Sequence, residues 1–383
     1  MIPAGLRPAW AEVDLGAIRS NVSEVVRVTG APCVCAVVKA EAYGHGAVPV
    51  AGAVLEGGAT WLAVALVEEA APLRAAGIDA PVLVLAEPPS VEAMAEAARL
   101  DLRVAIYTDR GVDAAVAAGV RRVHVKVDTG MHRVGAAPED ALALAKSAAA
   151  AGLEVEGVWT HFAVADEPDR DDRYTARQVE RFDECVAELA RAGIEAAIVH
   201  ASNSAGGLLA GAPYGMVRVG IAVYGYEPNP ASPSGAALRP ALSLVARVSH
   251  AKRLPAGVAI SYGLRYRLER DAWVATVPLG YADGVPRRLS AVGGEVLVGG
   301  RRRPIAGTVT MDQLMVDCGD DAVEVGDEVV LIGAQRGERG DRGDRGDRGE
   351  ERITADDWAT RLDTISYEIL CGISPRVPRL YVG

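Results

Sequence analysis

A lysine stands at the end of an apolar run in the segment AVVKAEAYGHG, residues 36–46. The chain contains 40 Lys and Arg residues, yet its only lysines are Lys39, Lys126, Lys146 and Lys252. Arginine therefore supplies nearly all of the positive charge. A lysine at the end of an expected buried strand then indicates a need for an amine that can lose its proton and attack a carbonyl. Lys39 is a candidate nucleophile, with an ordinary surface charge as the alternative.

Further candidates stand where later apolar runs end, and in a barrel of parallel strands such positions form the working rim. They are Tyr43, Lys126, Arg133, His161, His200, Ser204, Arg218, Gly220 and Ile221. The Ser204 hydroxyl and the amides of Gly220 and Ile221 suit anionic oxygens, as in barrel phosphate sites. A reactive lysine beside a phosphate site predicts pyridoxal phosphate held as a Schiff base. Taken singly, each residue also fits a structural role, such as a core histidine or a helix cap.

The elements that must position these residues are short apolar runs, most of them separated by alanine-rich helical stretches. The runs cover residues 33–38, 61–66, 82–86, 102–107, 123–128, 155–162, 198–203 and 216–225. Continuous apolar strands that alternate with helices are typical of a parallel sheet covered on both faces. Eight of them predict an α/β fold with an N-terminal (β/α)8 TIM-type barrel. We expect this barrel to occupy residues 1–237.

The pattern changes from about residue 238, where shorter alternating segments are separated by turns. Such alternation favours antiparallel strands, so residues 238–383 are expected to form a mainly β C-terminal domain. Within it, RGERGDRGDRGDRGEE at residues 336–351 contains no apolar residue to bury. We expect this stretch to be an exposed, mobile loop.

Composition narrows the class of function. The formal net charge of −11 argues against a nucleic-acid partner or an anionic membrane surface, because both would repel the chain. The five cysteines are widely scattered and suggest neither a disulfide framework nor a metal site. No apolar run of membrane-spanning length and no signal-like start is present, so a cytoplasmic location is expected.

Several segments occur in a fixed order along the chain. They are AVVKAEAYGHG, KVDTGMHRVG, WTHFAVADE, VHASNSAG, MVRVGIAVYG, SYG, GYADGVPRRL, TMDQLMVD and TISYE. Together they resemble the alanine racemases, and the resemblance runs from about Val13 to Tyr381. It implies a barrel with a β domain and a head-to-tail homodimer with shared active sites. It also implies pyridoxal 5'-phosphate-dependent interconversion of L-alanine and D-alanine, which supplies D-alanine for peptidoglycan.

The resemblance implies a role for each catalytic residue. Inverting a stereocentre needs a base on each face of the cofactor. Lys39 would bind the cofactor and serve as the base on the D-alanine face, and Tyr262 from the partner subunit would be the base for L-alanine. Because an unperturbed tyrosine titrates near 10, Tyr262 needs help, and His161 would orient it. Arg218, supported by His200, would face the pyridine nitrogen and favour racemisation over transamination.

The resemblance also implies the binding residues. The phosphate ligands would be Tyr43, Ser204, Gly220, Ile221 and Tyr367. Arg133 and the partner's Met311 amide would bind the substrate carboxylate, and Lys126 matches a lysine that is often carbamylated. Tyr281 and Asp312 resemble residues at the site entrance and behind it.

The chain departs from the family pattern at Glu41, where asparagine is common, at His132, where glycine is frequent, and at Thr310, where cysteine is common. Three other functions fit parts of the pattern. A racemase for serine or other small amino acids differs only in pocket contacts. A related barrel decarboxylase would place a carboxylate where Arg218 stands, and a non-catalytic pyridoxal phosphate carrier would resemble the first domain alone.

Overall fold

The structure is a computed structural model that describes residues 6–167, 173–210, 214–337 and 349–383. The chain divides into two compact units, and each is described by itself. The barrel unit spans Gly16–Arg239, and the C-terminal unit combines Pro240–Gly383 with the start of the chain up to Leu15. Within the described residues, no helix is both long and apolar enough to cross a lipid bilayer.

The barrel unit is a closed ring of parallel strands in sequential order, β2 to β9, which confirms the predicted (β/α)8 barrel. The strands are β2 (Cys33–Val37), β3 (Trp61–Val64), β4 (Val82–Val84), β5 (Arg103–Ile106), β6 (Arg122–Lys126), β7 (Glu154–Trp159), β8 (Ile198–His200) and β9 (Met216–Val219). β9 pairs with β2 and closes the ring. Because every strand is covered on both sides, residues such as Leu62, Leu83 and Ala105 are fully buried.

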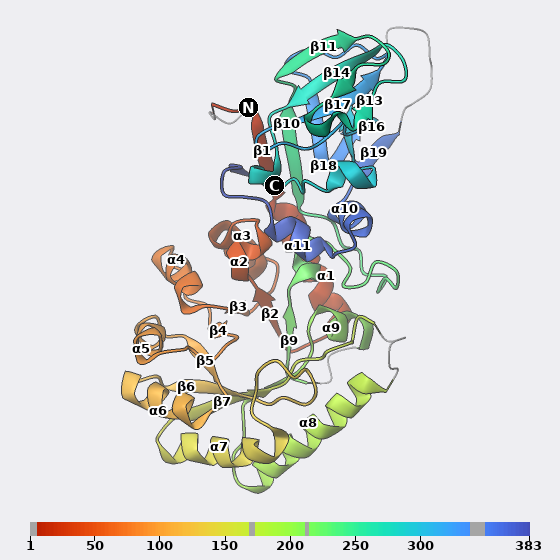
Figure 1. Ribbon diagram of the computed structural model, residues 1–383. Coiled ribbons are helices and arrows are strands. Elements are labelled where there is room, and N and C mark those ends of the chain that lie inside the picture. Colours follow the sequence, from red (N-terminus) through yellow and green to blue (C-terminus); the bar gives the residue numbers. More distant parts are fainter. Residues whose placement is uncertain (1–5, 168–172, 211–213, 338–348) are drawn as a thin grey trace. The chain divides into compact units, whose positions relative to one another are not determined.

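Helices precede, connect and follow these strands (Figure 1). They are α1 (Leu15–Thr29), α2 (Lys39–Tyr43), α3 (Ala47–Glu56), η1 (Val67–Glu69), α4 (Ala70–Ala75), α5 (Val91–Arg99), α6 (Asp109–Ala118), α7 (Pro138–Ala150), α8 (Tyr174–Arg191), α9 (Ser204–Ala210) and η3 (Ile221–Tyr224). Several of these helices begin at residues that favour a helix start. Ser90 and Thr108 accept hydrogen bonds from the first turns of α5 and α6, and Pro138 opens α7.

The C-terminal unit is mainly β, as predicted (Figure 1). Its larger sheet has the order β16-β15-β18-β10-β1-β20, with β19 beside β18, and smaller sheets have the orders β11-β14-β17 and β12-β13. The strands of the larger sheet are β1 (Ala9–Asp14), β10 (Leu242–Arg247), β15 (Glu295–Val298), β16 (Arg301–Pro304), β18 (Glu328–Arg336), β19 (Glu350–Ile353) and β20 (Arg379–Val382). The others are β11 (His250–Leu254), β12 (Ala259–Ile260), β13 (Tyr266–Arg267), β14 (Ala272–Val277) and β17 (Leu314–Gly319). Helical segments are η4 (Tyr262–Leu264), η5 (Tyr281–Asp283), η6 (Leu289–Val292), α10 (Ala355–Leu362) and α11 (Ser366–Cys371).

The start of the chain belongs to the C-terminal unit, which corrects the expected assignment of residues 1–237 to the barrel. The physical reason is strand pairing, because β1 runs antiparallel to β10 and parallel to β20. Residues near both ends of the chain therefore lie in one sheet (Figure 1). Of the expected loop at 336–351, residues 338–348 lie outside the described residues, and its flanks pair as Arg336 with Glu350.

Candidate active site

Lys39 lies one residue beyond Val38, which follows β2, and it begins α2 at the carboxyl end of the barrel strands. The residues after it, Ala40 to Tyr43, have φ values of 52° to 53°, which is a left-handed turn made without glycine. Such a turn costs about 1–2 kcal/mol per residue, so its surroundings must hold it in place. Glu69 accepts a hydrogen bond from the amide of Ala40 (2.7 Å), and Glu41 accepts one from the amide of Ala47 (3.1 Å). The side chain of Glu41, which stands where asparagine is common in the family, thus supplies an acceptor for a backbone amide at the start of α3.

Phosphate-ligand candidates of the barrel unit come together at the ends of β2, β8 and β9. The amide of Gly220 donates to the hydroxyl of Ser204 (3.0 Å). A Cβ atom at Gly220 would lie 2.4 Å from the phenolic oxygen of Tyr43, so only glycine permits this close approach. The Tyr43 ring stacks on Tyr224 with centroids 4.7 Å apart, and Ile221 opens η3 beside Gly220. Hydroxyls and backbone amides gathered at one corner suit a phosphate group.

Arg218 on β9 is a buried cation with neutral partners. One Nη atom donates to Nδ1 of His200 (2.9 Å), and the other donates to Nδ1 of His161 (3.2 Å) and to the carbonyls of Thr160 and Ala201 (2.9 Å each). The guanidinium carbon also lies 4.5 Å from the centre of the Trp159 ring. These contacts fix the orientation of the guanidinium.

The electrostatics of this region are strongly positive. Burial lowers the pKa of Arg218 to about 10. Burial first, and then the nearby charges of Arg218, Arg133, Lys126 and Lys39, lower the pKa of His161 well below its usual range. Burial and Arg218 do the same for the pKa of His200. Both histidines are therefore neutral near pH 7. Several cations close to one neutral histidine favour an anionic ligand, and pyridoxal phosphate fits this setting.

Lys126 ends β6 inside the barrel, where its ammonium donates to the carbonyl of Val134 (2.9 Å) and lies 4.6 Å from the Trp159 ring centre. Burial, followed by the charge of Arg218, lowers its pKa to about 8. The following loop is folded by Asp128, whose carboxylate accepts from the amide of His132 (3.0 Å). His132 has a φ of 54°, which explains why glycine would be favoured there. The neighbouring Arg133 is exposed.

The other site candidates belong to the C-terminal unit. Tyr262 begins η4 and is 73% exposed, although its backbone carbonyl accepts a hydrogen bond from the hydroxyl of Thr308 (2.9 Å). The preceding Ser261 has a φ of 66°, and its hydroxyl donates to the carbonyl of Thr308 (2.6 Å). An anchored backbone therefore presents a solvent-facing phenol. Burial at an interface would explain such an exposed aromatic side chain.

The structure brings Tyr281, Met311 and Asp312 together. The amide of Tyr281 donates to the carbonyl of Thr310, and the next amide donates to the carbonyl of Met311, both at 3.0 Å. Asp312 forms an ion pair with Arg376 (2.7 Å). Tyr281 and Met311 are 41% and 52% exposed. Tyr367 lies in α11 and is half-buried. The expectation that this set serves the barrel's site stays a prediction.

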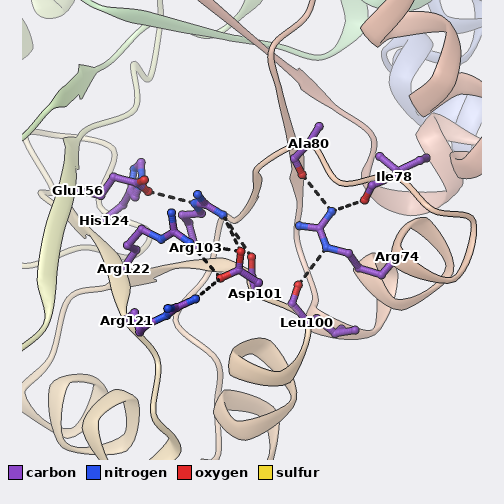
Figure 2. A network of polar contacts seen from close by, with 10 residues as sticks. All are labelled: Arg74, Ile78, Ala80, Leu100, Asp101, Arg103, Arg121, Arg122, His124 and Glu156. Atoms are coloured by element: carbon purple, nitrogen blue, oxygen red, sulfur yellow. Dashed lines mark hydrogen bonds and ion pairs between the residues drawn. The ribbon is translucent and has the colours of Figure 1, made fainter.

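Sequence reasoning missed two polar residues that the structure connects to the site. His124 on β6 is fully buried, and its Nδ1 lies 2.9 Å from Nε2 of His200. Its Nε2 lies 3.2 Å from the carboxylate of Glu156 on β7 (Figure 2). A signal was present, because His124 stands two residues before Lys126 in VHVKVD and must share its face of the strand.

Comparison with known proteins identifies the family. Residues 13–228 match the model of the alanine racemase N-terminal domain, and residues 241–381 match that of the C-terminal domain. An alanine racemase of Symbiobacterium thermophilum is 50% identical over 99% of this chain and 98% of its own length. One from Frankia casuarinae is 44% identical, with the same coverage.

Solved structures of alanine racemases are also similar to this chain. The alanine racemase of E. faecalis has a TM-score of 0.88 at 38% identity, covering 100% of both chains. That of Bacillus anthracis with bound L-Ala-P has a TM-score of 0.87 at 41% identity, covering 99% of this chain and 96% of its own. The chain therefore belongs to the alanine racemase family.

Proposed function

We propose that this protein interconverts L-alanine and D-alanine with pyridoxal phosphate as its cofactor. Family membership supports the reaction. The observation that carries the proposal within the structure is the group of cations around Arg218, next to the corner formed by Tyr43, Ser204 and Gly220. An anionic cofactor would neutralise the cations around Arg218, and its phosphate would bind at the corner formed by Tyr43, Ser204 and Gly220.

Residues of this chain would hold the cofactor at three points. Lys39 would bind its aldehyde carbon covalently, and the Gly220 corner, with Ile221 and Tyr367, would bind its phosphate. Arg218 would face its ring nitrogen. When bound, pyridoxal phosphate makes the substrate's α-proton acidic by withdrawing electrons from the α-carbon. Because Arg218 carries only donors and is anchored by His200, it would leave the ring nitrogen unprotonated and limit transamination.

Two groups would move the proton. The amine of Lys39 would accept or return it on the D-alanine face, and the phenol of Tyr262 from a partner subunit would do so on the L-alanine face. His161 is suited to support the phenol. Its Nδ1 faces an Arg218 nitrogen that can only donate, so neutral His161 carries its proton on Nε2. That N–H is a donor for a phenolate oxygen.

Substrate binding and assembly complete the proposal. Arg133 and the amide of the partner's Met311 would bind the alanine carboxylate. Lys126, an amine of lowered pKa, would be carbamylated beside Arg133. Tyr281 and Asp312 would shape the entrance. Two copies would form a homodimer with shared sites, supplying D-alanine for peptidoglycan. A cytoplasmic location is supported by the free state of all five cysteines.

The test is to incubate the purified protein with L-alanine, D-alanine and L-serine and to follow chirality over time. We expect both alanine enantiomers to racemise to the same end point and serine to react more slowly. The protein should show a visible absorbance band from the bound cofactor, and Lys39→Ala should lose it. Racemisation of serine as fast as alanine would replace the proposal with a broad-specificity racemase. A colourless, inactive protein in excess cofactor would refute it.

A further inference from the structure

A continuous row of polar side chains runs through the interior of the barrel. It consists of Arg218, His200, His124, Glu156, Arg103 and Asp101, and we call it the polar spine. One end lies at Arg218 beside the candidate active site. The other end reaches Asp101 (Figure 2), which precedes β5 at the amino end of the strands. The side chain of Asp101 is 57% exposed.

The donors and acceptors in the spine allow only one direction of hydrogen-bond donation, from Arg218 towards Glu156. Arg218 can only donate, so Nδ1 of His200 must accept at 2.9 Å. Neutral His200 therefore carries its proton on Nε2 and donates it to Nδ1 of His124, 2.9 Å away. His124 in turn carries its proton on Nε2 and donates to Glu156 (3.2 Å). Each ring thus has the tautomer that its neighbours demand.

At the other end of the spine, Arg103 donates to the carboxylate of Glu156, which therefore remains a hydrogen-bond acceptor. The same carboxylate oxygen that faces His124 also accepts from Nε of Arg103 (3.2 Å), and a guanidinium cannot accept a hydrogen bond. Burial raises the pKa of Glu156, but the hydrogen bond from His124 and the charge of Arg103 outweigh it, so the net shift is downward. Arg103 is itself paired with Asp101 at 3.5 Å. Glu156 is therefore a carboxylate near neutral pH.

Neighbouring residues on β6 and β7 pack closely around the histidine rings of the spine. A Cβ atom at Gly157 would lie 2.2 Å from Nδ1 of His124, so a side chain there would displace the His124 ring. The pairing of β6 and β7 shifts at this point, from Val123 with Val155 to His124 with Gly157, which leaves Glu156 as the extra residue. The Trp159 ring lies parallel to His200, with centroids 5.5 Å apart.

We propose that Glu156, acting through His124 and His200, is a positioning residue that fixes Arg218 by locking both histidines in their Nε2–H tautomers. Without an acceptor at Glu156, the buried Nε2–H of His124 would have lost its partner, although Nδ1 could still accept from His200. A proton shift through both rings would then place a donor of His200 against a donor of Arg218. The lock follows from this chain's own contacts, whereas its effect on catalysis rests on the proposed function.

The test measures the tautomers directly. The full-length protein, labelled with 15N at its six histidines, is studied by long-range 1H–15N NMR with and without added pyridoxal phosphate. Signals are assigned with His124→Gln and His200→Gln. We expect His124 and His200 in the unsubstituted protein to be neutral, with the proton on Nε2. An Nδ1–H tautomer or an imidazolium at either residue would overturn the proposal before Glu156 is substituted.

Two substitutions at one position separate positioning from general stability. Glu156→Gln keeps an oxygen that can accept from both His124 and Arg103, so the tautomers should persist. Glu156→Leu removes the acceptor, so His200 should show a mixture of tautomers, and kcat should fall about tenfold with KM nearly unchanged. If Glu156→Leu folds and leaves both tautomers intact, the proposal is wrong. If the tautomers change but the unsubstituted protein racemises no alanine, the proposed function fails and the lock stands.

Discussion

Individual residues in this site gain their properties from burial. Lys126 is an ordinary lysine in sequence, yet 1% exposure beside Arg218 lowers its pKa to about 8. Gly220 is needed for the space that its missing side chain gives to Tyr43. The partners of Arg218 are neutral. A carboxylate in their place would compete with an anionic ligand for the positive charge of Arg218.

Gly220→Ala should weaken binding of pyridoxal phosphate by tenfold or more. The added methyl would lie 2.4 Å from the Tyr43 oxygen and push the phenol out of the phosphate corner. Titration of the purified protein with cofactor, followed by absorbance, measures this effect. Gly52→Ala is the matched control, because nothing lies within 4 Å of its added methyl. Equal affinity in both variants would remove Gly220 from the phosphate site.

Lys126 should take up carbon dioxide. Its lowered pKa leaves a large fraction of the side chain as free amine at pH 8, and only the amine forms a carbamate. We expect a carbamate carbon signal by 13C NMR in protein equilibrated with 13C-bicarbonate, and its loss in Lys126→Ala. The exposed Lys146 offers the control, since Lys146→Ala should keep the signal. A signal that survives in Lys126→Ala would contradict the assignment.

At the scale of elements, the left-handed turn after Lys39 depends on a side chain outside it. Glu69 accepts from the amides of Ala40, Ala65 and Leu66, with distances of 2.7, 2.8 and 3.1 Å. Its carboxylate thereby ties the end of β2 to the segment after β3. The turn is held by tertiary contacts because its own residues disfavour it.

Glu69→Ala should lower the free energy of unfolding by roughly 1–3 kcal/mol, because three backbone donors lose their acceptor. Urea denaturation measures this loss. Hydrogen exchange at the amide of Ala40 should also become faster. Glu68→Ala changes an exposed neighbour and should do neither. If the two variants behave alike, Glu69 does not hold the turn.

Sequence predicted the elements better than the contacts between them. The eight apolar runs identified every barrel strand, because continuous burial leaves a continuous apolar pattern. β1 was missed as part of the C-terminal unit, because its partners β10 and β20 lie more than 200 residues away and leave no local trace. His124 and Glu156 were missed for the same reason. The role of a buried histidine depends on its contacts with residues on other strands, which the neighbouring sequence does not reveal.

For the whole molecule, the buried histidines predict sensitivity to acid. The folded protein keeps His124, His161 and His200 neutral, since their pKa values lie below the usual 6.5. The unfolded chain binds protons at these residues below about pH 6.5, so the free energy of unfolding should fall as pH drops from 7.5 to 5.5. Urea midpoints at fixed protein concentration measure this.

His124→Gln should reduce that pH dependence, because one proton-binding difference between the folded and unfolded states is removed. His250 is exposed, so His250→Gln should leave the dependence unchanged. Constant stability between pH 7.5 and 5.5 would show that the buried histidines take up protons in the folded protein.

The proposed active site requires two copies of the chain, and a mixed dimer tests this most directly. Lys39→Ala and Tyr262→Phe chains with different affinity tags are co-expressed, and the dimer carrying both tags is purified. If each site combines Lys39 of one copy with Tyr262 of the other, the mixed dimer has one intact site. It should then racemise alanine at about half the rate of the unsubstituted dimer, while both parent variants are severely impaired. A mixed dimer no more active than its parents would contradict the account.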